Sequence, residues 1–376
     1  MRELRFALDF CDLCFWCVQF SVMFLNAICM LVHIDDVFDG DNELREMESK
    51  RIGVWVAAIV LTALIAVSGT AYYFGVGPFS RNRAKLVVAT TTSLYDTTLL
   101  DAIEDQFEDN YPIDIYFISA GTGIAITYAQ RGDADMILVH APLKERSFLE
   151  DGYGVCRKIV AYNFFTIVGP AGDPAGLIGL TPSHALAKIV EEGRKGAVAW
   201  VSRGDDSGTH TKEKSLWDAA GFEWIELREE DWFLESGTGM GKTLQITDEK
   251  SAYTLADMGT YLKYYTDQLI SLAVVVDVGK ELLNVYSAIA VNRTYNPEVS
   301  FDAALSFTKF LVSEEGQQII DQFGQDVYPQ KLFYPAVQLL KERTNAALAS
   351  WIEEFAYFDG EECPDKYQDN CKELYN

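Results

Sequence analysis

Three short apolar segments of this chain each run into a turn rich in Ser, Thr and Gly, and then into a helical pattern. The first is Lys85–Ala89 with the turn Thr90–Ser93, and the second is Ile113–Ser119 with the turn Ala120–Gly123. The third leads into the stretch Ser202–His210, which reads SRGDDSGTH. Strands that repeatedly feed helices predict an α/β fold with a mostly parallel sheet, because parallel strands need a helical crossover.

These turns have the chemistry of an anion site. The first turn of a helix presents backbone N–H groups without intrahelical partners, and the helix dipole favours negative charge there. In the third stretch, Gly208 would let a ligand approach the backbone and Arg203 would supply positive charge. A lone hydroxyl at such a turn is ordinarily an N-cap, so the prediction depends on the three turns meeting at one ligand. The predicted oxyanion pocket consists of Thr91, Thr92, Ser93, Thr122, Arg203, Ser207, Gly208 and Thr209.

The alternation of strands and helices continues along most of the chain and predicts two lobes. We expect the first lobe to comprise residues 85–168 and 288–350, and the second lobe to comprise residues 169–287. Residues 351–376 are expected to form an acidic tail. Ligands of open parallel sheets bind beyond the carboxyl ends of the strands, which is where the candidate turns lie.

The N-terminal part has a different composition. Residues 52–80 carry no charged side chain, and the apolar stretch 52–74 is long enough to cross a bilayer. Lys50 and Arg51 precede this stretch, so the positive-inside rule puts the following residues outside the cytoplasm, at the cell surface or in the periplasm. We expect residues 47–80 to be a membrane anchor, because the apolar run exceeds an ordinary signal-peptide core; a cleaved signal peptide is the alternative.

Residues 1–46 form a hydrophobic extension. The sequence leaves two interpretations of it open: a second membrane span, or a stretch that precedes the true start of the protein. The spacing of Cys11, Cys14 and Cys17 is compatible with a zinc or iron–sulfur site. The residues between them are mostly apolar, so we interpret these cysteines as small apolar side chains and predict no metal.

The overall charge limits the kind of partner that the chain can bind. The chain has 376 residues, with 31 basic and 56 acidic side chains and a net charge of -25. A nucleic-acid partner would require a basic face, so we expect none. An anion must then be attracted locally, by oriented dipoles and Arg203. In the tail, an extracytoplasmic location would permit a disulfide between Cys363 and Cys371, with two free thiols as the alternative; Cys156 has no evident partner.

Residues 85–345 resemble the substrate-binding proteins of ABC importers for tungstate, which have the two-lobed type II periplasmic-binding-protein fold. The motifs that carry the resemblance are Thr90–Ser93, Gly121–Gly123, Arg131–Asp135, Leu138–Pro142, Ser202–His210, Gly239–Gly241 and Ala252–Tyr261. The resemblance implies capture of tungstate outside the cytoplasm and its delivery to a membrane permease driven by an ATPase. It also implies that the pocket residues predicted above bind the oxyanion.

The ligand prediction depends on the residue at position 140. Related phosphate-binding proteins look similar around an Asp-Ala-Pro sequence, where this chain has His140-Ala141-Pro142. Tungstate is a fully ionised tetrahedral dianion that only accepts hydrogen bonds, whereas hydrogen phosphate also has a proton to donate. The loss of the carboxylate therefore favours tungstate, with molybdate and then phosphate as the alternatives. We expect His140, Asp206 and Met240 to support the pocket from behind.

An anion-processing enzyme, such as a phosphatase or a nucleotide-using transferase, is the rival hypothesis. It would need a nucleophile activated by a base, and Ser207 has only Asp205 near it in sequence. The stretch Ser236–Thr243 is similar to a phosphate loop, but Ser236 replaces its first glycine and no apolar strand precedes it. We therefore predict a binding protein that is not an enzyme and has no cofactor.

Overall fold

The structure is a computed structural model that describes Thr62, residues 83–369 and residues 371–375. The predictions for residues 1–46, and for almost all of 47–80, fall outside the described residues. Among the helices that are described, none is both long and apolar enough to cross a bilayer. All the elements below belong to one compact unit, Asn82–Asn376.

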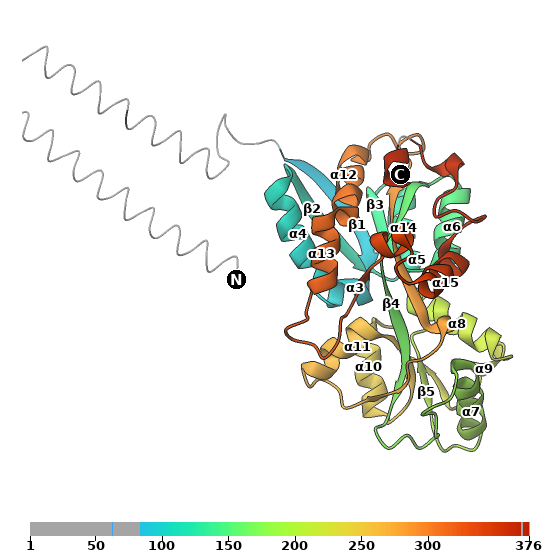
Figure 1. Ribbon diagram of the computed structural model, residues 1–376. Helices are drawn as coiled ribbons and strands as arrows, with labels where there is room; N and C mark the ends of the chain where they lie inside the picture. The colour runs from blue at the N-terminus through green and yellow to red at the C-terminus, as the bar shows by residue number, and fades with distance from the viewer. Residues whose placement is uncertain (1–61, 63–82, 370, 376) are drawn as a thin grey trace, which may run out of the picture. The chain divides into compact units, whose positions relative to one another are not determined.

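A mixed sheet forms the centre of this unit, with the strand order β10-β4-β9-β3-β1-β2 (Figure 1). Its strands are β1 (Ala84–Thr91), β2 (Ile113–Ala120), β3 (Met136–Val139), β4 (Gly154–Gly169), β9 (Leu283–Val291) and β10 (Tyr334–Pro335). β1 pairs in parallel with β2 and β3, as the strand-to-helix pattern predicts. β9 is antiparallel to both β3 and β4. The prediction of a mostly parallel sheet is therefore wrong, because the two connecting strands β4 and β9 run in opposite directions.

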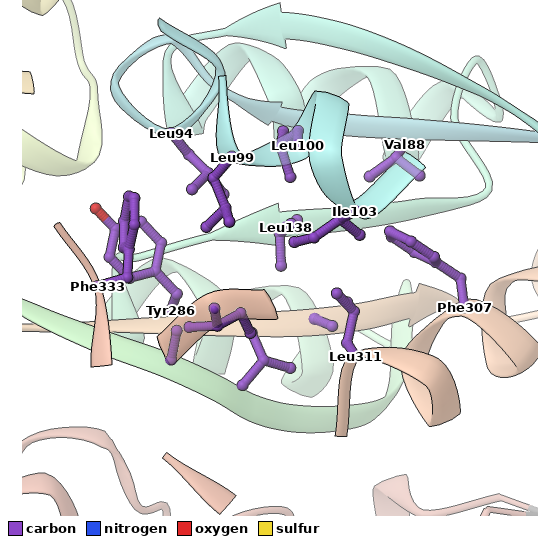
Figure 2. Packing of buried hydrophobic residues seen from close by; sticks show 14 of the residues in the cluster. Val88, Leu94, Leu99, Leu100, Ile103, Leu138, Tyr286, Phe307, Leu311 and Phe333 are labelled. Atoms are coloured by element: carbon purple, nitrogen blue, oxygen red, sulfur yellow. The ribbon is translucent and has the colours of Figure 1, made fainter. Parts of the chain in front are cut away.

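Helices cover this sheet on both faces. They are α3 (Thr92–Asp96), α4 (Leu99–Asn110), α5 (Thr122–Arg131), α6 (Pro142–Glu150), α12 (Phe301–Val312), α13 (Glu314–Gln322), α14 (Val337–Glu342) and α15 (Ala346–Ala356). In α4, apolar side chains three and four residues apart form one buried stripe that includes Ile103 and Phe107. Ile103 packs with Val88 of β1, Leu138 of β3 and Phe307 of α12 in the core shown in Figure 2.

A second set of elements forms around the far half of β4. Its strands are β5 (Trp200–Ser202), β6 (Phe233–Glu235), β7 (Thr254–Asp257) and β8 (Ala273–Val276), and its helices are α7 (Pro182–Arg194), α8 (Gly208–Ala219), α9 (Trp224–Leu227), α10 (Met240–Glu249), α11 (Met258–Thr266) and the single 3-10 turn η1 (Lys280–Leu282). This set has its own core, in which Trp200 and Trp217 meet edge to face with ring centroids 5.1 Å apart.

One long strand joins the two sets. β4 pairs with β9 as far as Phe164, and with β7 and β8 from Phe165 onward. The chain returns at Leu283, where β9 begins. From this pairing we propose a first lobe of residues 83–164 and 283–375 and a second lobe of residues 165–282. Both crossings between the lobes lie a few residues before the expected ones, and the first lobe also includes the part that was expected to be a separate tail.

The C-terminal tail packs on β4 rather than forming a separate loop. α15 crosses the expected start of the tail at residue 351, and two 3-10 turns follow, η2 (Asp365–Tyr367) and η3 (Lys372–Tyr375). The carboxylate of Glu362 accepts hydrogen bonds from Ile159 N at 2.6 Å and from Lys158 Nζ at 2.7 Å, both on β4. These contacts bring the end of the chain back to the first lobe.

The disulfide joins Cys156 to Cys371, with their Cα atoms 5.9 Å apart, and Cys363 is a buried free thiol. The predicted bridge between Cys363 and Cys371 is therefore wrong. Cys363 and Cys371 are close in sequence, whereas the folded tail brings Cys371 to Cys156 on β4, 215 positions away.

Candidate anion-binding site

The three hydroxyl-rich turns of the sequence are also the starts of three helices in the structure. Thr91 and Ser207 are the N-caps of α3 and α8: Thr91 Oγ1 accepts a hydrogen bond from Leu94 N at 3.3 Å, and Ser207 Oγ accepts one from His210 N at 3.1 Å. Gly121 is the N-cap of α5. The caps at Thr91 and Ser207 satisfy one donor each, and the other N–H groups of a first helical turn have no intrahelical partner. In α5, one of these groups, Gly123 N, donates to Asp206 O at 3.4 Å.

The turns lie against one another. A Cβ atom added to Gly121 would lie 3.3 Å from Asp205 O and 3.6 Å from the Cα of Ser207, so the start of α5 abuts the turn before α8. A Cβ on Gly239, the N-cap of α10, would lie 3.6 Å from Thr92 Oγ1. The first and second lobes therefore meet where the predicted pocket residues are.

Arg203 is the buried cation of this region. Its side chain is 1% exposed, forms an ion pair with the carboxylate of Asp205, and donates a hydrogen bond from Nη2 to Thr92 Oγ1 at 3.2 Å. Asp205 also accepts a hydrogen bond from Ser207 N at 3.2 Å through its other oxygen. A buried guanidinium in contact with both lobes can attract and orient an oxyanion.

Several donors of the predicted pocket have no partner in the part of the chain that the structure describes. They are Thr122 Oγ1, Thr209 Oγ1 and Arg203 Nε, all of them buried. A buried polar atom without a hydrogen bond is costly, and native proteins contain few of them. Others lie outside the predicted set, such as His210 Nε2. The unpaired donors of three predicted pocket residues indicate a site that an acceptor-rich ligand would complete.

His140 lies beneath the pocket and is neutral. Its Nδ1 is 2.9 Å from Asn284 Oδ1, and the Asn284 amide donates to Tyr286 Oη at 3.0 Å, so Nδ1 carries the proton. Nε2 then accepts from the hydroxyl of Ser93 at 3.3 Å. Burial lowers the pKa of His140 to about 3. A Cβ on Gly208 would lie 2.6 Å from the imidazole Cε1, so the ring supports the first turn of α8 without contributing charge.

The other two supporting residues have different places. Met240 is fully buried in the apolar core of the sheet, at the start of α10. Asp206 lies at the rim, where its carboxylate pairs with Lys144 Nζ at 2.6 Å. Its side chain is 62% exposed.

Two buried carboxylates of the site were missed by the sequence analysis. Glu213 on α8 accepts hydrogen bonds from Ser202 Oγ at 2.9 Å and Trp200 Nε1 at 2.8 Å, and burial raises its pKa to about 7. Asp257 is the N-cap of α11, and burial raises its pKa to about 6. Glu213 lies one helical turn after Thr209, and that spacing is the only sequence signal that connects it to the pocket.

Comparisons with known proteins identify the family of this chain. Residues 72–315 match the model of the PBP superfamily domain. Over 291 residues the chain is 37% identical to the tungstate-binding protein TupA of Peptoclostridium acidaminophilum, covering 76% of this chain and 98% of the relative.

Solved structures give the same result. One is the tungstate-binding protein TupA from Desulfovibrio alaskensis G20, 39% identical with a TM-score of 0.57, over 67% of this chain and 98% of that chain. Another is described as the tungstate ABC transporter from Geobacter sulfurreducens, 38% identical with a TM-score of 0.57, over 64% of this chain and 98% of that chain. The chain therefore belongs to the PBP superfamily, within the group that contains these tungstate-binding proteins.

Proposed function

We propose that this protein is the substrate-binding component of an ABC importer and that it captures tungstate between its lobes. The observation that carries the proposal is the set of buried, unpaired donors at Thr122, Thr209 and Arg203. Relatives that match nearly their whole length to this chain are described as tungstate-binding proteins, which supports the same ligand.

The chemistry of the pocket suits a ligand that only accepts hydrogen bonds. The hydroxyls of Thr122 and Thr209 can donate to it, and so can the guanidinium of Arg203. The nearest carboxylate on the same turn, Asp205, is already engaged with Arg203 and Ser207 N. Donors that are fixed in place before binding lose little freedom when the ligand enters, which favours high affinity.

Titration tests whether the site binds tetrahedral oxyanions of this kind. Molybdate has almost the same size and shape as tungstate, so the donors named above would hold both. Phosphate differs because it brings a proton of its own. Isothermal titration of the purified protein with tungstate and molybdate in turn would test the ligand class: tight binding of either supports an oxyanion receptor, and binding of neither contradicts it.

We also propose a location outside the cytoplasm, with residues 52–74 as the membrane anchor and an ABC permease with its ATPase as partners. The uncharged composition of that segment supports the anchor. Fractionation tests it, since the full chain should sediment with membranes and a variant without residues 1–80 should stay in the supernatant. Equal recovery of both in the supernatant would contradict the anchor.

Binding, rather than catalysis, is the activity we propose. Ser207 Oγ accepts a hydrogen bond from His210 N, a backbone donor, so this contact supplies no base that could activate the hydroxyl. Incubation of the protein with phosphate esters should release no phosphate.

A further inference from the structure

Asp206 belongs to the second lobe, yet its polar contacts reach the first. It follows Asp205 in the turn before α8. Its carboxylate pairs with Lys144 Nζ at 2.6 Å, and its carbonyl oxygen accepts from the same Nζ at 2.9 Å. The carbonyl oxygen also accepts from Gly123 N, on α5, at 3.4 Å. Lys144 lies in the first turn of α6, so one residue of the second lobe connects to two helices of the first.

The position of Asp206 depends on the residue opposite it. A Cβ atom on Gly123 would lie only 2.2 Å from Asp206 Oδ2, so the carboxylate has room only because residue 123 is glycine. Asp206 itself has a φ of 56°, a left-handed conformation that costs a non-glycine residue free energy. The surrounding contacts must compensate for that cost.

We propose, resting on the function proposed above, that Lys144 and Asp206 form a latch between the lobes and that Lys144 is a positioning residue for the anion site. The latch holds the start of α8 against the start of α5. It thereby keeps Ser207 and Thr209 facing Thr122, so that donors of both lobes reach one ligand. Lys144 acts through Asp206.

The first test compares two neutralised cations of the same helix. Lys144→Gln removes the latch, whereas Arg146→Gln removes the same charge two residues later. Arg146 pairs with Glu150 and Asp359, both in the first lobe, so it is the matched control. We expect Lys144→Gln to weaken tungstate binding by about two- to fivefold relative to Arg146→Gln, the range of a solvent-exposed ion pair. Faster dissociation should account for most of the loss, because the pair forms as the lobes meet.

The second test uses the space at Gly123. Gly123→Ala should displace the exposed carboxylate of Asp206 and weaken binding by about two- to fivefold, as loss of the same ion pair does in Lys144→Gln. In Gly123→Ala/Asp206→Gly the two closest contacts of the new methyl group are removed, and the next one, to the backbone oxygen of residue 206, is an ordinary 3.4 Å. Glycine also accepts the left-handed φ of that position. The double variant should therefore bind as well as Asp206→Gly alone.

The outcomes separate the two proposals. If the wild-type protein binds no tungstate, the proposed function fails and the latch fails with it. If it binds tungstate but Lys144→Gln and Arg146→Gln behave alike, only the latch is overturned. A double variant at positions 123 and 206 that binds about two- to fivefold more weakly than Asp206→Gly would also overturn it, because the clash would then not involve the carboxylate. Thermal unfolding without ligand shows that each variant is folded.

Discussion

Arg203 reaches from the second lobe to Thr92 of the first, with Nη2 and Oγ1 3.2 Å apart. Its Nε has no partner among residues 83–369 and 371–375. The same nitrogen, Nη2, contacts both Thr92 and Asp205, and Nε is left over as a donor. That arrangement gives Arg203 two roles, binding of the anion and contact between the lobes.

Arg203→Ala should abolish high-affinity tungstate binding while the protein stays folded. The variant removes the buried positive charge of the anion motifs and the contact with Thr92, and it leaves Asp205 without its counterion. Titration calorimetry measures the affinity, and circular dichroism checks the fold. Affinity within tenfold of the wild type would refute the assignment. Arg146→Ala, an exposed arginine of α6, is the control for loss of charge.

Thr122→Val and Thr209→Val should weaken binding without destabilising the unliganded protein. Each variant keeps the side-chain shape and deletes a buried hydroxyl that has no partner within the described residues. Losing one donor to a charged ligand should cost about 1.5–3 kcal/mol, roughly a tenfold to hundredfold loss of affinity.

Thr308→Val is the matched control for these two variants. Thr308 is equally buried, but its Oγ1 donates to Ala304 O at 2.9 Å within α12. This variant should lose stability and keep its affinity. If all three variants change stability and affinity in the same way, the unpaired hydroxyls have no special role.

The stability of the protein should depend on His140 between pH 7 and pH 5. The pKa of this residue falls from 6.5 to about 3 on folding, because the ring is buried. Below pH 6.5 the unfolded chain therefore binds a proton that the folded chain does not, and stability is lost as the pH falls. The loss from this group should be about 2 kcal/mol between pH 7 and pH 5.

Urea unfolding of the wild type and of His140→Gln at both pH values measures this contribution. The wild type should lose more stability than the variant between pH 7 and pH 5. All other titrating groups are common to both proteins, so the difference between the two losses is the contribution of His140. Equal losses would mean that His140 keeps its ordinary pKa in the folded protein.

Reduction of the disulfide between Cys156 and Cys371 should destabilise the protein. Cross-linking positions 215 residues apart restricts the unfolded chain strongly, so Cys156→Ser should cost about 2–5 kcal/mol. Cys363→Ser, which leaves the disulfide intact, is the control. Urea unfolding with and without reductant should show that only Cys156→Ser matches the reduced wild type. A reduced wild type as stable as the oxidised protein would contradict this role.

Local patterns were sufficient to predict the turns of the candidate site. Hydroxyls at Thr91 and Ser207 precede helices, as capping preference dictates, and the strands before them are short and apolar. The structure brings these turns together, while their contact with a ligand stays a prediction.

Long-range features could not be predicted in this way. The antiparallel course of β9 and the pairing of Cys156 depend on where distant segments return. The place of Lys144 opposite Asp206 likewise depends on how two lobes meet. The spacing of residues within one helix or strand does not predict any of these long-range contacts.

Competition titration of tungstate against phosphate tests the central claim most directly. The Nε2 of His140, where a carboxylate would accept the proton of hydrogen phosphate, is already engaged with Ser93. Hydrogen phosphate would therefore leave its own proton unpaired, which should cost about 1–3 kcal/mol, or roughly tenfold to a hundredfold in affinity. His140→Asp should narrow this gap by weakening tungstate more than phosphate, because a carboxylate repels the dianion. We predict that the wild type binds tungstate at least tenfold more tightly than phosphate; equal affinity for the two would contradict the assignment of tungstate.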